Sequence, residues 1–471
     1  MPSLELWRLR AEFARRLSDM YAEEVPAYNT LVEVSTEVNE DYLRRRGAEA
    51  ERLGSISRVT AERHGAVRVG SRREMSEAAR VFAAFGMHPV GFYDLRDASE
   101  ASVPVVSTAF RPVDPDELAR NPFRVFTSML AADDPRFFST ELRERLRAFF
   151  DARTLFSPEL LDLADKAAAD GRLSAPDAER LLRLATGAFK LSGDPVDHAW
   201  YRTLEAVSAV ASDIGGVTST HINHLTPRVL DIDDLYVRME ARGITMIDEI
   251  QGPPRWDGPD VLLRQTSFRA LSEDRVFRFE DGRLGPGELR VRFGEVEQRG
   301  IALTPAGRDL YDRMVAETDR HPAAREGNGA RRVDVARRTW EENFPRTEKE
   351  LALRGLAYFT YALDRDAVPP RFADSFQGGP VPLHILVEKG IAVPEPIVYE
   401  DFLPRSAAGI FRSNLTDEGS RDDAQTETDY DITVMSEIVG RPVADPDDLY
   451  RRQQDRSLRA LGEALGREIA P

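Results

Sequence analysis

Two histidines, His64 and His224, lie in segments that each predict a β-strand, over residues 59–69 and 217–230. Neutral imidazole is a common ligand for zinc, copper and iron, so two strand histidines could hold a metal if the fold brings them together. A lone strand histidine is more commonly an ordinary half-buried residue. The chemistry therefore depends on whether the two strands meet.

An internal repeat gives a reason to expect that they do. Residues 64–111 and 224–269 share one order of features: a strand histidine, an amphipathic helix, a glycine, a strand, and a last strand with a similar ending. Equivalent residues lie 157 to 160 positions apart, which favours duplication over a chance resemblance of two strand–helix units. The equivalent positions are His64 and His224, Gly86 and Gly243, and Thr108-Ala109-Phe110-Arg111 and Thr266-Ser267-Phe268-Arg269.

The last strand of the second unit, over residues 289–300, supplies carboxylates. Side chains alternate along a strand, so Phe293, Glu295, Glu297 and Arg299 share one face. Two carboxylates there are costly to bury unless they are paired or bind a metal, and a solvated face with Glu–Arg pairing is the alternative. The equivalent strand of the first unit, 123–130, has no carboxylate. The residues predict two histidines and one glutamate, with Glu295 and Glu297 both open as the third ligand.

Two imidazoles and one carboxylate with open positions are typical of non-heme Fe(II) oxygenases, although Zn(II) or Mn(II) would also bind. Arg68 lies on the same strand face as His64, and a guanidinium can grip a carboxylate through two parallel hydrogen bonds. Arg68 is therefore a candidate to bind an anionic substrate beside the metal, with a surface arginine as the alternative. Arg111 and Arg269 occupy equivalent places of the repeat, and we expect at least one of them to be structural.

The patterns predict an α+β fold in which two βαβββ units form a half-open barrel around the metal, with large helical insertions and extensions. In the first unit we expect strands over 59–69, 89–95, 104–113 and 123–130, and a helix over 73–85. The expected division is N-terminal helices (1–58), first unit (59–132), helical insertion (133–215), second unit (216–302), and a C-terminal helical and mixed region covering the active site (303–471).

Composition excludes several classes of protein. The net charge of -17 argues against nucleic-acid binding, which needs a basic surface. The chain has no cysteine, which excludes disulfides, thiolate catalysis and cysteine-bound zinc or iron–sulfur clusters. With no apolar run of about 18 residues and no signal-peptide pattern, we expect no membrane association and a cytoplasmic protein. The acidic stretch 416–429 could be disordered or a lid.

Around Phe293-Gly294-Glu295-Val296-Glu297-Gln298-Arg299 the sequence resembles the 2-oxo acid dioxygenases of the vicinal oxygen chelate superfamily, and the resemblance implies that Glu295 is the metal ligand. Nearly the whole chain resembles a narrower family, the 2-oxoadipate dioxygenase/decarboxylases, also called hydroxyglutarate synthases. The matching motifs are ERHGAVRVG (62–70), STAFRP (107–112), RNPFRVFTS (120–128), HINHLTPR (221–228), RQTSF (264–268) and YEDFLP (399–404).

This resemblance implies that His64, His224 and Glu295 bind Fe(II). It also implies that Arg68 binds a substrate carboxylate and takes part in catalysis, and that the backbone of Arg405 and Ser406 contacts the substrate. The protein would be a monomer or a small homo-oligomer.

The implied partners are O2 and a 2-oxo dicarboxylic acid, most closely 2-oxoadipate, which would chelate Fe(II) through its carboxylate and keto oxygen. The substrate would lose CO2 and be hydroxylated on the neighbouring carbon, giving 2-hydroxyglutarate in lysine degradation without a 2-oxoglutarate cosubstrate. The alternatives are a Zn- or Mn-dependent lyase or isomerase on the same scaffold, with Glu297 as base, and a binding protein with a residual metal site.

Overall fold

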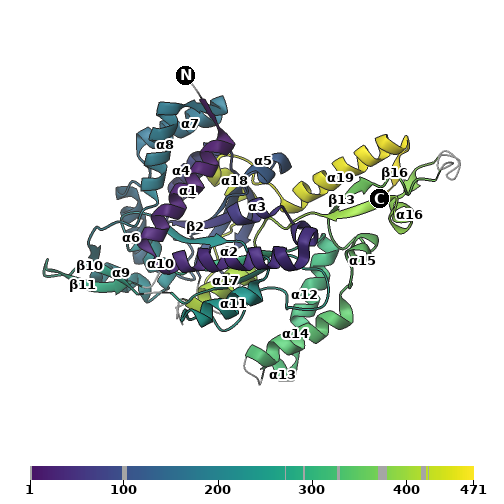
Figure 1. The fold of residues 1–471 in the computed structure, drawn as a ribbon. Helices are drawn as coiled ribbons and strands as arrows, with labels where there is room; N and C mark the ends of the chain where they lie inside the picture. The colour runs from purple at the N-terminus through teal and green to yellow at the C-terminus, as the bar shows by residue number, and fades with distance from the viewer. Residues whose placement is uncertain are drawn as a thin grey trace.

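A five-stranded sheet with the order β3-β4-β5-β2-β8 lies at the centre of the protein (Figure 1). The computed structural model describes residues 3–97, 103–270, 272–289, 292–325, 329–369, 379–414, 421–422 and 424–470. β2 and β5 are parallel, and the other neighbours are antiparallel. The strands are β2 Arg63–Val69, β3 His88–Asp94, β4 Val105–Arg111, β5 Arg124–Leu130 and β8 Ile222–Pro227.

Alternate residues of this sheet enter two different cores, as the two-residue period of a strand requires. In β4, Val106 and Phe110 join the core formed with the N-terminal helices, whereas Val105 and Ala109 join the core formed with the C-terminal region. β4, β5 and β8 are buried along their whole length. The sheet is therefore covered on both faces, and a polar side chain pointing from it must find a partner inside the protein.

The second unit attaches to the edge strand β8. β9 (Leu263–Ser267) and β12 (Glu295–Arg299) form an antiparallel pair. A parallel bridge between Arg228 and Glu297, with a 2.8 Å hydrogen bond from Val229 N to Glu297 O, joins β12 to the end of β8. The first unit shows the same relation, with β5 parallel to β2 and antiparallel to β4. Strand pairing thus follows the predicted repeat.

The α+β class is confirmed, and in the first unit the strand–helix–strand–strand–strand order is present, with α4 (Arg72–Ala83) as its helix and α5 (Pro115–Arg120) between β4 and β5. In the second unit, α11 (Ile232–Ala241) is followed by a single bridge at Met246 where we predicted a strand. A hairpin of β10 (Glu273–Arg278) and β11 (Leu284–Leu289) is inserted before β12 and extends from the left of Figure 1.

The strand predicted over 59–69 begins late, because a short helix, α3 (Ile56–Ala61), occupies its first residues. The side chain of Ser55 accepts a hydrogen bond from the Arg58 amide and caps this helix. Ser3 precedes the first helix but does not cap it. It lies in β1, and the residue at the cap position, Glu5, makes no capping side-chain bond.

Helices cover the sheet from both ends of the chain. α1, α2, α4 and α11 contribute to the core on one face, and Ala407 of α17 (Pro404–Asn414) packs against the core on the other (Figure 1). The N-terminal elements are β1 Ser3–Glu5, α1 Leu6–Glu24, α2 Ala27–Arg46 and η1 Gly47–Glu51. Between the two units lie α6 Thr140–Ala152, α7 Pro158–Asp170, β6 Arg172–Ser174, α8 Ala175–Ala188, β7 Val196–Asp197, α9 His198–Glu205 and α10 Ala209–Gly215.

The C-terminal region after β12 mixes helices with short strand pairs, β13 with β15 and β14 with β16. Its elements are α12 Pro305–Arg320, α13 Pro322–Arg325, α14 Gly329–Asn343, α15 Glu348–Leu353, β13 Phe359–Leu363, β14 Val381–Pro382, α16 Leu383–Glu388, β15 Ala392–Pro396, α17 Pro404–Asn414, α18 Ile432–Val439, α19 Pro446–Leu465 and β16 Ile469–Ala470. Part of the predicted acidic stretch, residues 416–420 and 423, lies outside the described residues. Among the described helices, none has the length and apolarity needed to cross a membrane.

Candidate metal centre

Three buried side chains, His64, His224 and Glu295, converge from β2, β8 and β12. One ligand atom from each lies within 4.8 Å of the other two. Nε2 of His64 lies 3.7 Å from one carboxylate oxygen of Glu295, and Nε2 of His224 lies 3.4 Å from the other. Within the described ranges of the chain, no other cluster of three potential ligands meets this spacing.

Strand register explains why the two histidines meet. In the antiparallel β2–β8 pair, His64 lies opposite Thr226 and Ala66 lies opposite His224. Residues 64 and 66 point to the same face, so the two histidines form a diagonal cross-strand pair, which is close enough for large side chains to touch. Their ring centroids are 5.4 Å apart. The predicted meeting of the two strands is therefore what assembles the site.

Each imidazole is oriented through its other nitrogen. Nδ1 of His224 lies 3.0 Å from the Thr226 hydroxyl, and Nδ1 of His64 lies 2.8 Å from a carboxylate oxygen of Glu297. A proton on each Nδ1 leaves each Nε2 with a lone pair aimed at the centre, which is the tautomer that a metal ligand needs. Burial lowers the pKa of His64 and, much further, that of His224, so both rings are neutral near pH 7.

The structure distinguishes Glu295 from Glu297. Burial alone would raise the pKa of Glu297, but Arg299 and His64 outweigh it and lower this pKa to about 2. Glu295 has the opposite environment, because burial and then the nearby Glu297 raise its pKa well above the usual value. The Gln265 amide donates a hydrogen bond to Glu295. The charge of Glu297 is already neutralised by Arg299. Glu295 instead faces the two Nε2 atoms, and its buried charge still needs a cation.

These donors fit a divalent transition metal. Two neutral imidazoles and one carboxylate bind from one side, and the carboxylate would gain the positive charge that its burial requires. The donor set suits Fe(II), and also Zn(II) or Mn(II).

The triad lies at the end of a small, mainly apolar cavity. Arg68 lies there with the ligands, as the alternation along β2 predicted, and two residues of α17, Ala407 and Ile410, contribute to the wall. The lining residues are His64, Ala66, Val67, Arg68, Phe126, Ser128, His224, Gln265, Phe293, Glu295, Phe402, Ala407 and Ile410.

Comparison with known proteins identifies relatives of this chain. Residues 13–414 match the family described as 2-oxoadipate dioxygenase/decarboxylase. A protein of that name from Mycobacterium tuberculosis is 55% identical over 447 residues, covering 95% of this chain and 96% of its own. Another from Escherichia coli is 38% identical over 459 residues, covering 96% and 98%. The crystal structure of hydroxyglutarate synthase from Pseudomonas putida in complex with 2-oxoadipate superimposes with a TM-score of 0.82 at 38% identity, covering 99% and 100%.

The chain belongs to the 2-oxoadipate dioxygenase/decarboxylase family.

In this family member, Arg68 is held by a residue that the sequence did not single out. Its guanidinium lies 2.5 Å from a carboxylate oxygen of Asp213 in α10, and both side chains are buried. Asn223 donates to the same oxygen at 3.0 Å, and Nε2 of His221 lies 3.4 Å from the other oxygen. Asp213 comes from the helical segment between the units, where no periodicity or motif marks it.

The segment after Pro404 lies over the cavity, but its two predicted contact residues differ in exposure. The side chain of Arg405 is largely exposed and pairs with Asp319 of α12, whereas Ser406 is buried. Neither side chain lines the cavity, which receives Ala407 and Ile410 instead. Substrate contacts through the backbone at 405 and 406 stay a prediction.

The equivalent arginines of the repeat have structural partners. Arg111 is buried and binds both oxygens of Asp401, at 2.8 and 3.0 Å. Arg269 is half exposed and pairs with Asp248 at 2.8 Å. The expectation that at least one of them is structural is confirmed by Arg111.

Proposed function

We propose that this family member converts 2-oxoadipate and O2 into 2-hydroxyglutarate and CO2 at an Fe(II) bound by His64, His224 and Glu295. The reaction balances without a second organic substrate, because the original carboxyl group leaves as CO2, one oxygen atom of O2 completes the new carboxylate at the former keto carbon, and the other becomes the new hydroxyl. The observation that carries the proposal is the triad itself, with both Nε2 atoms directed at Glu295 inside a cavity that also contains Arg68.

The side chains around the triad would bind and shield the substrate. Arg68 would bind the carboxylate that is distant from the keto group, because a buried guanidinium can form parallel charge-assisted hydrogen bonds. Phe126, Phe402 and Ile410 would exclude water from the reacting carbon. Fe(II), when bound, would supply open positions for a 2-oxo acid and O2 and the electrons that activate O2.

We further propose that the two strand units form the half-open barrel of the vicinal oxygen chelate arrangement. The support is the strand pairing that the two units share. Within each unit the first and last strands are parallel, and the first strands of the two units pair antiparallel. We propose with it the division of the chain into five regions, with boundaries after residues 58, 132, 215 and 302.

A Zn- or Mn-dependent lyase or isomerase has less support. It needs a base beside the metal, and Glu297 was the candidate. Both oxygens of Glu297 accept hydrogen bonds from Arg299, at 2.7 and 2.8 Å, and its pKa is lowered to about 2, which makes it a poor proton acceptor.

The deciding experiment loads metal-free protein separately with Fe(II), Zn(II) and Mn(II) and adds 2-oxoadipate. We expect O2 uptake and CO2 release in equal amounts with Fe(II), and ¹⁸O from ¹⁸O2 in the hydroxyl of 2-hydroxyglutarate. Turnover of 2-oxoadipate with Zn(II) or Mn(II) and no O2 uptake would contradict the proposal.

The ligand set is tested by Glu295→Gln, which keeps the shape of the side chain and removes its charge. Losing this ligand should lower kcat/KM about a thousandfold, or about 4 kcal/mol of barrier. Glu74→Gln serves as the control, because Glu74 is also a fully buried glutamate but lies in α4, outside the triad. Full iron binding in His224→Ala would show that another residue takes the place of His224.

A further inference from the structure

Glu297 lies directly behind His64, on the side away from the candidate metal. One of its carboxylate oxygens is 2.8 Å from Nδ1 of His64, and both side chains are fully buried. Glu295, two residues earlier on the same strand, lies on the opposite side of the same ring, 3.7 Å from Nε2. The imidazole of His64 thus sits between two carboxylates, of which one faces the metal position and one does not.

Two arginines keep Glu297 in this place. Arg299 donates to both of its oxygens, and Arg124 lies 3.5 Å from one of them. Arg299 is itself anchored, because it also donates to the backbone carbonyls of Tyr399 and Asp401, at 2.8 and 3.0 Å. Because these carbonyls fix the Arg299 guanidinium, the Glu297 carboxylate that it binds has little freedom to rotate toward the metal.

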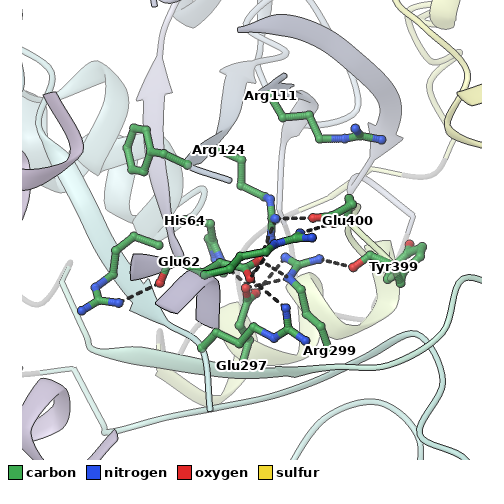
Figure 2. A network of polar contacts seen from close by, with 12 residues as sticks. Glu62, His64, Arg111, Arg124, Glu297, Arg299, Tyr399 and Glu400 are labelled. Atoms are coloured by element: carbon green, nitrogen blue, oxygen red, sulfur yellow. Dashed lines mark hydrogen bonds and ion pairs between the residues drawn. The ribbon is translucent and has the colours of Figure 1, made fainter. Parts of the chain in front are cut away.

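A wider network balances these buried charges (Figure 2). Arg124 also binds Glu62 and Glu400, Arg228 binds Glu62 at 2.8 Å, and Arg58 closes the network by binding Glu400. Three arginines and three glutamates are thereby paired inside the protein, with Arg58 at the rim. Removing one partner of a buried ion pair leaves an uncompensated charge and strongly destabilises the protein. Each member of the network therefore holds the others in place. The residues are Glu62, Glu297, Glu400, Arg58, Arg124, Arg228 and Arg299.

We propose that Glu297 is a positioning residue for the metal ligand His64, and that Arg299 and Arg124 hold it away from the metal. Two consequences follow. His64 keeps its proton on Nδ1 and its Nε2 on the metal, as second-sphere carboxylates do for other metal-bound histidines. The metal keeps one carboxylate ligand instead of two, which leaves positions open for substrate and O2. The proposal rests on the proposed function only in taking His64 and Glu295 as ligands.

The test measures metal binding without turnover. Metal-free protein is titrated with Co(II) under argon, and the visible absorption of bound Co(II) gives both the affinity and the number of ligands. Glu297→Gln should weaken Co(II) binding by about 10- to 100-fold, the usual effect of losing such a partner, while the shape of the absorption bands stays that of the wild type. Glu297→Asp, which restores the charge on a shorter chain, should fall between the two.

Glu74→Gln is the matched control. Glu74 is a fully buried glutamate held by two hydrogen bonds from Arg153, at 2.6 and 2.8 Å, as Glu297 is held by Arg299, but it lies in α4 and touches no candidate ligand. Both substitutions remove one buried charge and should lower thermal stability. Only Glu297→Gln should lower Co(II) affinity. If Glu297→Gln does not fold, the comparison of Glu297→Asp with Glu74→Asp carries the test.

Three results would overturn the proposal. An unchanged Co(II) affinity in Glu297→Gln would remove the positioning role. An equal loss of affinity in Glu74→Gln would reduce the effect to general destabilisation. Absorption bands in Glu297→Gln that match those of Glu295→Gln would make Glu297 a ligand. If His64→Ala keeps full Co(II) affinity, the ligand assignment itself fails, which is distinguishable from the other outcomes.

Discussion

The two strand units of this protein place different residues at equivalent points of the site. In the first unit, parallel pairing sets Arg68 opposite Ser128, and in the second the parallel bridge sets Arg228 opposite Glu297. Since Arg68 and Arg228 each lie four residues after the unit's histidine, Ser128 corresponds to Glu297. Two residues earlier on each last strand, Phe126 corresponds to Glu295.

The same strand position is therefore occupied by Phe126 in one unit and by Glu295, the proposed carboxylate ligand, in the other, and both line one cavity. The arginines have diverged too, because Arg68 enters the cavity while Arg228 binds the buried Glu62. In the proposed function the two similar halves divide the work: each would supply one histidine, the second would supply the negative charge for the metal, and the first would supply apolar surface and a cation for the substrate.

Replacing Phe126 by alanine should have the largest effect on stability. Phe126 packs against Tyr93 and Phe402, with ring centroids 5.3 and 4.9 Å away, and truncating a buried aromatic costs about 3–5 kcal/mol. The free energy of unfolding in guanidinium chloride measures this. Phe279→Ala, on the projecting hairpin, is the control with a smaller loss. A loss below about 1 kcal/mol at Phe126 would mean that the first unit's wall is not part of the core.

Arg68→Ala should impair the reaction selectively. Losing a buried charged partner of the distal carboxylate should cost about 2 kcal/mol, or about thirtyfold in kcat/KM, for 2-oxoadipate. For 2-oxohexanoate, which has the same length and no distal carboxylate, the change should be small. Arg269→Ala, at an exposed arginine, is the control. Equal losses for both substrates would assign Arg68 to holding Asp213 and not to binding the substrate.

The second unit carries the titratable His221 where the first has Ala61, and this difference should appear as a pH dependence of stability. Burial lowers the pKa of His221 to about 4, with Asp213 opposing the shift. Because the folded-state pKa lies below the unfolded value of about 6.5, the unfolded chain binds a proton first and stability falls as pH drops from about 6.5 toward 4.

His221→Gln should remove up to one proton from this dependence, or about 1.4 kcal/mol per pH unit. Urea unfolding of metal-free protein between pH 6 and 4.5 measures the slope. His64 and His224 titrate in both proteins, so they do not affect the difference. Identical slopes would show that His221 does not stay neutral in the folded state.

Arg405→Ala should have the smallest effect. Its side chain is 63% exposed and pairs with Asp319, and surface pairs of this kind contribute less than about 1 kcal/mol. Steady-state assays should give kcat and KM close to those of the wild type. A tenfold fall in kcat/KM, about 1.4 kcal/mol, would mean that this side chain reaches the substrate in the complex.

Sequence reasoning located the parts of the site that depend on regular periods. His64 and Arg68 share a strand face by alternation, and the repeat paired His64 with His224, as the β2–β8 register confirms. Alternation could not separate Glu295 from Glu297, because the two share a face and differ only in which side of the His64 ring they reach. That difference depends on Arg299 and on backbone carbonyls a hundred residues away.

Other features of the molecule could not be predicted from local sequence patterns. Asp213 reaches Arg68 from α10 through tertiary packing. In the sequence, a buried aspartate on a helix cannot be distinguished from one that is exposed to solvent. The start of β2 was misplaced because Val59 and its neighbours suit a strand, whereas the Ser55 cap starts a helix there.

The ladder between β2 and β8 has a consequence for how the metal is acquired. Backbone hydrogen bonds set the distance between the two imidazoles, and these bonds form when the sheet folds, with or without an ion. The conformational entropy of bringing the ligands together is therefore lost during folding and not on metal binding. Small zinc domains behave in the opposite way, since the metal organises the chain. Here a chelator should leave an empty but preorganised cage that recovers its ion without refolding.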